Sequence, residues 1–210
     1  MKGQFFPYGD SIKTGKFPIA TASLIAANLI IFIMSLSDFE RIIQTFGFVP
    51  DLFPSYFSVM TIFTSMFLHA GFDHIFGNMW YLWIFGDNVE DKLGTLKFIF
   101  LYIMSGIVAS LTQYITDPLS AIPSIGASGA VSGILGFYLV AFPKSRITTS
   151  SGYWVNEMPA WVVVGFWFAI QLFFGFATLA GYGGSNVAFF AHIGGFVFGY
   201  LAAKVAVKLQ

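Results

Sequence analysis

Four side chains in an otherwise apolar sequence are of the types needed for nucleophilic chemistry. Ser128 lies in PSIGASGAVSGILG, residues 123–136, a stretch with four glycines and three serines. His74 and Asn78 share a second apolar segment, and His192 lies in a third. A serine becomes a nucleophile when a base takes its proton and fixed donors hold the oxyanion. His192 is the candidate base, and His74, Asn78 and a backbone N–H at a helix start are candidate oxyanion donors.

Each of these residues also has a purely structural interpretation. Ser128 could be only a small residue that lets two helices pack, and Asn78 could make an interhelical hydrogen bond. His69, just before the segment of His74, could be an interfacial residue. Their coincidence favours chemistry, because ionisable groups within membrane segments are costly and by default suggest function. No carboxylate lies near His192 in the sequence, so a dyad fits better than a triad.

Other hydrolase chemistries fit the sequence less well. No HExxH motif is present, which disfavours a zinc protease. Asp73 and Asp87 lie at the ends of their segment, which disfavours an aspartyl dyad. Three histidines could in principle bind a metal, but Ser128 and Asn78 would then have no role. The absence of cysteine excludes thiol catalysis and cysteine-ligated zinc. We therefore expect no metal site.

The composition indicates that these residues lie in a polytopic membrane protein. Of the 210 residues, 57% are hydrophobic and 10% charged, whereas soluble domains carry ~25% charged residues. The net charge is zero and no basic run occurs, so nothing suggests nucleic acid binding. A helix needs about 20 mostly apolar residues to cross a bilayer. Six segments are candidates for such helices: 18–36, 72–86, 97–115, 127–142, 160–180 and 187–206.

The sequence therefore predicts an all-α fold, a bundle of six transmembrane helices. We expect a cytoplasmic N-terminal segment at 1–17 and a membrane domain at 18–206, which includes a long outer loop at 37–71. That loop is either an amphipathic hairpin in the outer leaflet or a cover over the bundle. The first apolar segment exceeds the about 7–15 apolar residues of a signal peptide, so we interpret it as a retained helix.

Lysines and arginines predict the orientation in the membrane. With the N-terminus in the cytoplasm, nine of the ten fall on the inner side and only Arg41 falls outside. The segments that contain His74, Ser128 and His192 then all run from outside to inside. We expect a bacterial cell (inner) membrane protein with both termini in the cytoplasm and a site open to the outer side.

The lengths of these segments predict the depth of the site. The fifteen residues from Ser128 to Phe142 form about 22 Å of helix, roughly 8 Å less than the hydrocarbon core. Ser128 should therefore lie below the outer surface, in the first turn of its helix. The lead-in DPLSAIPSIG would then be irregular backbone that protein must bury. His192 lies about 24 Å before Lys208, at a similar depth.

Glycines in two segments predict how Ser128 and His192 could meet. Both segments contain a small-xxx-small pattern, which allows close backbone approach. The pairs are Gly129/Gly133 and Gly195/Gly199. Close packing of the two helices would bring His192 within hydrogen-bond reach of Ser128.

Three motifs together resemble the rhomboid intramembrane serine proteases. They are HAGFDHIFGNMWYLWIFGDNVEDKLG, GASGAVSG and AHIGGFVFG, which follow the family's order and spacing across residues 60–205. The resemblance implies that Ser128 is the nucleophile and His192 the general base. It implies an oxyanion hole of His74, Asn78 and the Ser128 N–H, and that His69 is the additional histidine often found before the second helix. It also implies a cofactor-free endopeptidase that cleaves transmembrane segments of membrane proteins, with a small residue before the scissile bond.

Two features depart from the family's pattern, and the role of the fifth segment is open. Many rhomboids carry a Trp-Arg pair in the first outer loop, and its absence leaves the shape of 37–71 open. Some bacterial members have a tyrosine four residues after the nucleophile, stacked on the histidine. That position is Ser132 here, so what packs against His192 is open. The fifth segment is crowded with aromatic residues around one polar exception, Gln171, and is either a lipid-facing helix or a substrate gate. The loop AGYGGSN, residues 180–186, suits a mobile cap.

Two classes of function compete on this sequence. One is the intramembrane serine protease, whose partners would be a transmembrane substrate and the lipid bilayer. The other is a non-enzymatic membrane protein, either a rhomboid-like binder of transmembrane helices or a transporter with a histidine relay. A transporter would more commonly show carboxylates in the middle of the membrane or broken helices in symmetric halves, and the sequence has neither feature.

Overall fold

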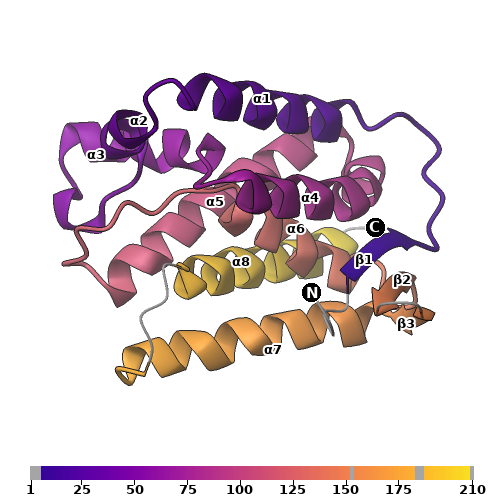
Figure 1. The fold of residues 1–210 in the computed structure, drawn as a ribbon. Helices are drawn as coiled ribbons and strands as arrows, with labels where there is room; N and C mark the ends of the chain where they lie inside the picture. The colour runs from indigo at the N-terminus through magenta and orange to yellow at the C-terminus, as the bar shows by residue number, and fades with distance from the viewer. Residues whose placement is uncertain (1–5, 152–153, 183–186, 209–210) are drawn as a thin grey trace.

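The computed structural model describes residues 6–151, 154–182 and 187–208. In this part of the chain, eight α-helices form a bundle with a small sheet at one end (Figure 1). The α-helices are α1 (Ile19–Ser35), α2 (Phe39–Phe46), α3 (Tyr56–Thr64), α4 (Phe72–Leu93), α5 (Thr95–Thr116), α6 (Ser128–Ala141), α7 (Ala160–Leu179) and α8 (Phe189–Lys208). Two 3-10 helices, η1 (Pro50–Leu52) and η2 (Ser65–Phe67), and three strands, β1 (Phe6–Asp10), β2 (Arg146–Ser151) and β3 (Trp154–Pro159), complete the fold.

Each of the six apolar segments identified in the sequence forms a helix, namely α1, α4, α5, α6, α7 and α8. The all-α membrane fold class is therefore confirmed. Among the described residues, α5, α7 and α8 are long and apolar enough to cross a membrane, and α1 and α6 are shorter apolar helices. α4 has 22 residues, but charged side chains occupy its last two turns. A count of six spans, and the boundaries 1–17 and 18–206, stay predictions.

α6 lies at the centre of the bundle. Its residues from Gly129 to Tyr138 are all buried, and α4, α5 and α8 pack around it. α1 packs on α4, while α7 lies at the opposite edge and packs mainly on α8 (Figure 1). α7 buries the smallest share of its residues among the three long apolar helices, so of these three it is the one least enclosed by the bundle.

Glycines bring the backbones of α6 and α8 into direct contact. A Cβ atom at Gly195 would overlap the carbonyl oxygen of Gly129, and one at Gly199 would overlap that of Gly133. The two small-xxx-small pairs thus face each other across one interface. This contact sets the first turn of α8, which carries His192, beside the first turn of α6.

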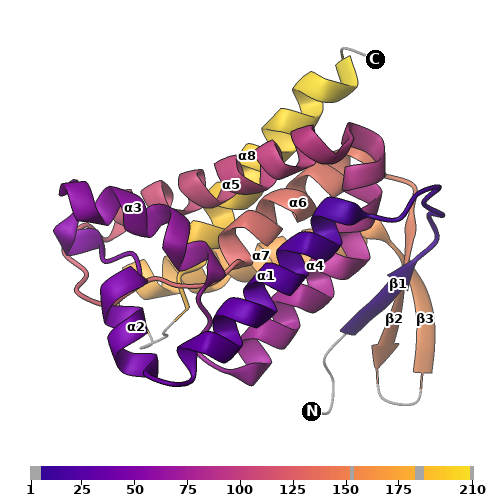
Figure 2. The same cartoon turned by 90° about the horizontal axis from the view of Figure 1, so that it is seen from above.

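The structure contains an antiparallel sheet, β1-β2-β3, that the sequence does not predict. It joins the segment before α1 to the connection between α6 and α7, and it lies at the end of the bundle opposite α2 and α3 (Figure 2). Proline and glycine are depleted in strands, and Pro7 and Gly9 therefore conceal β1 in the sequence. The predicted N-terminal segment 1–17 is thus partly docked on the domain; its residues 1–5 lie outside the described part.

The predicted outer loop 37–71 contains α2, η1, α3 and η2 rather than a single hairpin. Phe48 is fully buried, and its backbone pairs with Ser124 in an isolated antiparallel bridge. Phe46, Tyr56 and Phe57 are exposed. One part of the loop therefore covers the bundle and another presents apolar rings outward. Residues 183–186 of the predicted cap 180–186 lie outside the described residues.

Candidate active site

The segment before α6 holds Ser128 in place through backbone hydrogen bonds. The Gly126 N–H donates to the Ser65 carbonyl at 2.9 Å, and Ser124 exchanges two hydrogen bonds with Phe48. Gly126 has φ +123°, a region that favours glycine. Helix α6 then begins at Ser128 and has only 14 residues, about 21 Å. The irregular backbone expected before Ser128 is therefore paired with protein groups, as apolar surroundings require.

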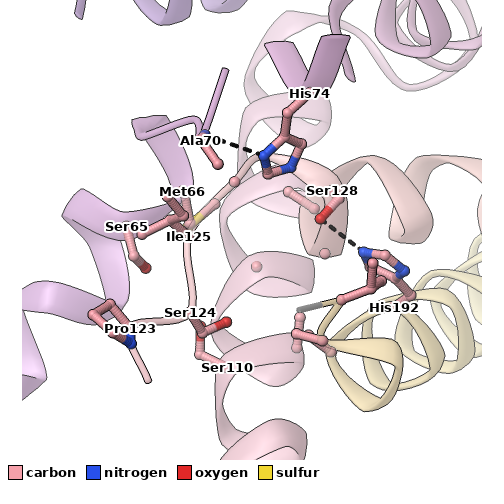
Figure 3. A pocket seen from close by; sticks show the side chains of 18 of the residues that line it. Ser65, Met66, Ala70, His74, Ser110, Pro123, Ser124, Ile125, Ser128 and His192 are labelled. Atoms are coloured by element: carbon pink, nitrogen blue, oxygen red, sulfur yellow. Dashed lines mark hydrogen bonds between the residues drawn. The ribbon is translucent and has the colours of Figure 1, made fainter. Parts of the chain in front are cut away.

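Ser128 and His192 lie within hydrogen-bond distance of each other. The Ser128 Oγ and His192 Nε2 atoms are 2.8 Å apart, although 64 residues separate them in the chain. Figure 3 shows the two side chains pointing toward one another from α6 and α8. A neutral imidazole at this distance can accept the hydroxyl proton and raise the nucleophilicity of the oxygen.

Gln171, on α7, contacts the other nitrogen of the His192 ring. Its Oε1 atom lies 2.8 Å from His192 Nδ1, and its Nε2 donates to the Trp167 carbonyl at 3.4 Å. Sequence reasoning noted Gln171 only as the polar exception in an aromatic helix. The available signal was a polar side chain in an otherwise apolar helix, because such a group needs a hydrogen-bond partner when it is buried.

Trp167, on α7, lies beside the ring of His192. Its ring centroid is 6.1 Å from that of His192, with the planes tilted by 34°. Ser132, four residues after Ser128, instead donates from Oγ to the Ser128 carbonyl at 2.6 Å. An aromatic residue on α7 therefore takes the place next to the histidine, and Ser132 is turned into its own helix.

His74 and Asn78 lie on α4 near Ser128, but their present hydrogen bonds are local. The Ala70 N–H donates to His74 Nδ1 at 3.3 Å, so the proton of a neutral His74 resides on Nε2. That Nε2 lies 2.7 Å from where a Cβ atom of Gly126 would be. Asn78 Nδ2 donates to the His74 carbonyl at 2.9 Å and retains a second hydrogen. Each side chain thus has one N–H left for a ligand.

His69 is buried in the segment between η2 and α4. Its Nε2 accepts a long hydrogen bond of 3.5 Å from the Ala127 N–H, and its ring packs edge-on against His74. Burial, together with the charge of a protonated His74, lowers the pKa of His69 to about 3. His69 is therefore neutral at physiological pH, and it supports the residue before the serine and one face of His74.

Two cavities reach Ser128 and His192 from different directions. A cavity of about 510 Å³ lies on the side of η2, α5 and the segment before α6, and His74 also lines it. Figure 3 shows Ser65, Met66 and Ser124 around this space. A second cavity of about 260 Å³ is lined by α4, α6 and α7, including Asn78, Ser132 and Trp167. Pockets of several hundred Å³ can hold a small ligand or a short peptide segment.

Comparisons with known proteins match the part of the chain that contains these residues. The family model described as "Rhomboid domain" matches residues 56–209. The chain is 30% identical to the putative rhomboid protease YdcA of Bacillus subtilis over 70% of its length and 67% of that protein. It is 33% identical to the rhomboid protease GluP of the same organism and 34% identical to RHOMBOID-like protein 1 of Arabidopsis thaliana, over 68% and 70% of its length. These matches cover only 25% of GluP and 34% of the Arabidopsis protein.

Proposed function

The chain belongs to the rhomboid family, and from this premise we propose that it is an intramembrane serine endopeptidase with a dyad of Ser128 and His192. One observation carries the proposal, the 2.8 Å distance between Ser128 Oγ and His192 Nε2 beside a cavity. Two relatives carry the names "Putative rhomboid protease YdcA" and "Rhomboid protease GluP".

The first half of the proposed reaction forms an acyl-enzyme. Ser128 Oγ attacks the peptide carbonyl carbon while His192 Nε2 takes the hydroxyl proton. The carbonyl oxygen becomes an oxyanion in a tetrahedral intermediate. When the C–N bond breaks, the protonated His192 gives its proton to the leaving amine. In the second half, water repeats the attack on the ester, His192 takes the proton of the water, and Ser128 is released with its proton restored.

His74 and Asn78 are proposed donors to the oxyanion, together with the Ser128 N–H. The N–H groups in the first turn of a helix lack intrahelical acceptors, so that of Ser128 is free to donate. The Nε2–H of His74 and the second Nδ2 hydrogen of Asn78 are side-chain donors on residues that line a cavity together with Ser128. Donors held in a water-poor site stabilise developing charge more than the same groups do in water.

The proposed substrate is a transmembrane segment of another membrane protein. The second cavity lies between α4 and α7 and reaches both dyad residues, which offers a lateral route from lipid. The proposed membrane orientation places both termini and the sheet in the cytoplasm and α2 and α3 outside. Nine of ten basic residues then lie on the inner side.

Replacing Ser128 tests this function directly. We expect Ser128→Ala to lower cleavage of a model transmembrane substrate in detergent by at least ~10³-fold, because no other group replaces the attacking oxygen. The same variant should lose labelling by a fluorophosphonate, which reacts with activated serines. Ser37→Ala, an exposed serine outside the site, is the matched control and should keep both. Cleavage by Ser128→Ala at the parent rate would refute the proposal.

A further inference from the structure

Gln171 occupies an unusual position for a polar side chain. α7 buries only Ala160, Val164, Gln171 and Gly175, which follow helical spacing and form one stripe toward the bundle. The rest of the helix is largely aromatic and aliphatic. A polar group buried among apolar ones is costly unless it is hydrogen-bonded, so the partners of Gln171 explain its presence.

The two partners of Gln171 fix which way its amide faces. Its Nε2 group donates to the Trp167 carbonyl one turn earlier, which leaves Oε1 directed at His192 Nδ1. An amide oxygen can only accept, so Nδ1 must carry the proton. His192 Nε2 is then unprotonated and able to accept the proton of Ser128.

The other groups around His192 do not provide this constraint. Ser128 faces it from α6, Trp167 lies beside it on α7, and the charged form of His74 acts on it from α4. Asp73 lines the second cavity together with His192, but Asp73 is exposed. Within residues 6–151, 154–182 and 187–208, no carboxylate forms an ion pair with His192. Gln171 is therefore the group that occupies the place of a third triad member.

We propose that Gln171 is a positioning residue that holds His192 in the tautomer and orientation of a general base. This inference rests on the proposed peptidase function. When Nε2 takes the proton from Ser128, the Nδ1–H bond to Gln171 remains, and the amide oxygen stabilises the imidazolium without accepting a proton. The amide is neutral, so its contribution is smaller than that of a carboxylate.

The location of Gln171 also links the base to the position of α7. Residues of α4 and Trp167 of α7 line the second cavity, so a substrate that enters there would push against α7. Moving α7 away would separate Gln171 Oε1 from His192 Nδ1 and free the ring to rotate. The dyad is then aligned only when α7 packs on α8.

Steady-state kinetics of Gln171→Leu test this role. We expect kcat to fall about tenfold, the effect of one neutral hydrogen bond, with KM within twofold of the parent. The rate of fluorophosphonate labelling at Ser128 should fall by a similar factor, since this small probe needs the base but no displacement of α7. Thr178→Val, which removes an exposed hydroxyl on the same helix, should change neither rate.

Gln171→Glu provides a test that does not depend on tolerance of leucine. A carboxylate keeps the acceptor and stabilises the imidazolium, so the acidic limb of the kcat/KM profile should move to higher pH while activity is retained. Parent labelling and kcat in Gln171→Leu, or an unmoved acidic limb in Gln171→Glu, would overturn the positioning role. Ser128→Ala measured alongside separates the cases, because the proposed function fails only if that variant still cleaves.

Discussion

At the scale of single residues, Gly126 couples the shape of the chain before Ser128 to the position of His74. Its positive φ disfavours any residue with a Cβ atom. The same Cβ would lie 2.7 Å from His74 Nε2 and 2.8 Å from its Cε1. The glycine thus lets the proposed oxyanion donor approach the start of α6 closely.

Gly126→Ala should therefore impair catalysis through His74. The new methyl group must displace the imidazole, and we expect kcat to fall by about 10²-fold, the effect of losing one oxyanion donor. Backbone strain should also lower the free energy of unfolding by about 1–3 kcal/mol. Kinetics and thermal unfolding in detergent measure the two effects. Gly165→Ala, where a Cβ meets nothing within 4 Å, is the control; equal kcat in both variants would contradict the coupling.

Residue spacing was enough to select the candidate site but not its hydrogen bonds. Counting residues from Ser128 and His192 to the inner charges gave the two a similar depth, and the structure brings them together. The pairing of Gln171 with His192 depends on the rotation of α7 about its axis, which an apolar segment does not encode in its sequence. Asn78 donates a hydrogen bond to the His74 carbonyl of its own helix. Residue type alone does not distinguish this partner from one on a neighbouring helix.

At the scale of elements, Glu90 attaches α1 to α4. Its carboxylate is buried and accepts hydrogen bonds from the Ala20 and Thr21 N–H groups, both at 2.8 Å. The hydroxyls of Thr21 and Thr95 donate to it at 2.9 and 3.1 Å. A carboxylate at a helix start pairs with N–H groups that have no intrahelical acceptor and with the positive end of the helix dipole.

Glu90→Ala should destabilise the bundle without changing the catalytic rate. We expect the free energy of unfolding to fall by about 3 kcal/mol, because several charge-assisted hydrogen bonds are lost and buried donors remain. Below the unfolding temperature, kcat should equal that of the parent. Asp91→Asn, which changes an exposed neighbouring carboxylate, should shift stability by no more than ~0.5 kcal/mol. Thermal unfolding in detergent measures the stability of both variants. Equal losses of stability in the two variants would contradict the anchoring role of Glu90.

The elements that apolar length and glycine spacing define were the predictable ones. Runs of apolar residues gave the six bundle helices, and the glycine pairs gave the contact of α6 with α8. β1 was missed because it is short and pairs with β2 over a long sequence distance, as Asp10 does with Ile147. β2 and β3 are also short, and they are neighbours in the chain that pair with each other. α2 and α3 were missed because the loop 37–71 is held together by contacts such as the bridge from Phe48 to Ser124.

At the scale of the whole molecule, Asp10 joins the sheet to the bundle. Its Oδ2 atom accepts hydrogen bonds from the Tyr138 hydroxyl of α6 and from Asn88 Nδ2 of α4, the latter at 2.7 Å. Its Oδ1 accepts from the Ile12 N–H at 3.1 Å. One carboxyl group thus links β1 to two helices that carry proposed site residues, at the end of the molecule away from the site.

This link gives the protein a pH-dependent stability. Burial raises the pKa of Asp10 above its ordinary value of 3.8, although the hydrogen bonds from Tyr138 and Ile12 oppose the rise. A carboxyl group with a higher pKa in the folded state binds its proton more tightly when folded. Its contribution to stability is therefore complete below 3.8 and is lost as pH rises through the folded value.

Asp10→Asn should remove this component, because the amide does not titrate and still accepts from Tyr138. We expect the stability of the variant relative to the parent to increase as pH rises from about 3.8, measured by thermal unfolding in detergent. Tyr138→Phe removes a hydrogen bond that lowers the pKa of Asp10. In that variant, the loss of stability with rising pH should therefore continue to a higher pH than in the parent. The opposite result would be a difference in stability between Asp10→Asn and the parent that stays constant across the pH range. It would show that the Asp10 carboxyl group titrates alike in the folded and unfolded chains. The attachment of the sheet would then not depend on the protonation of Asp10.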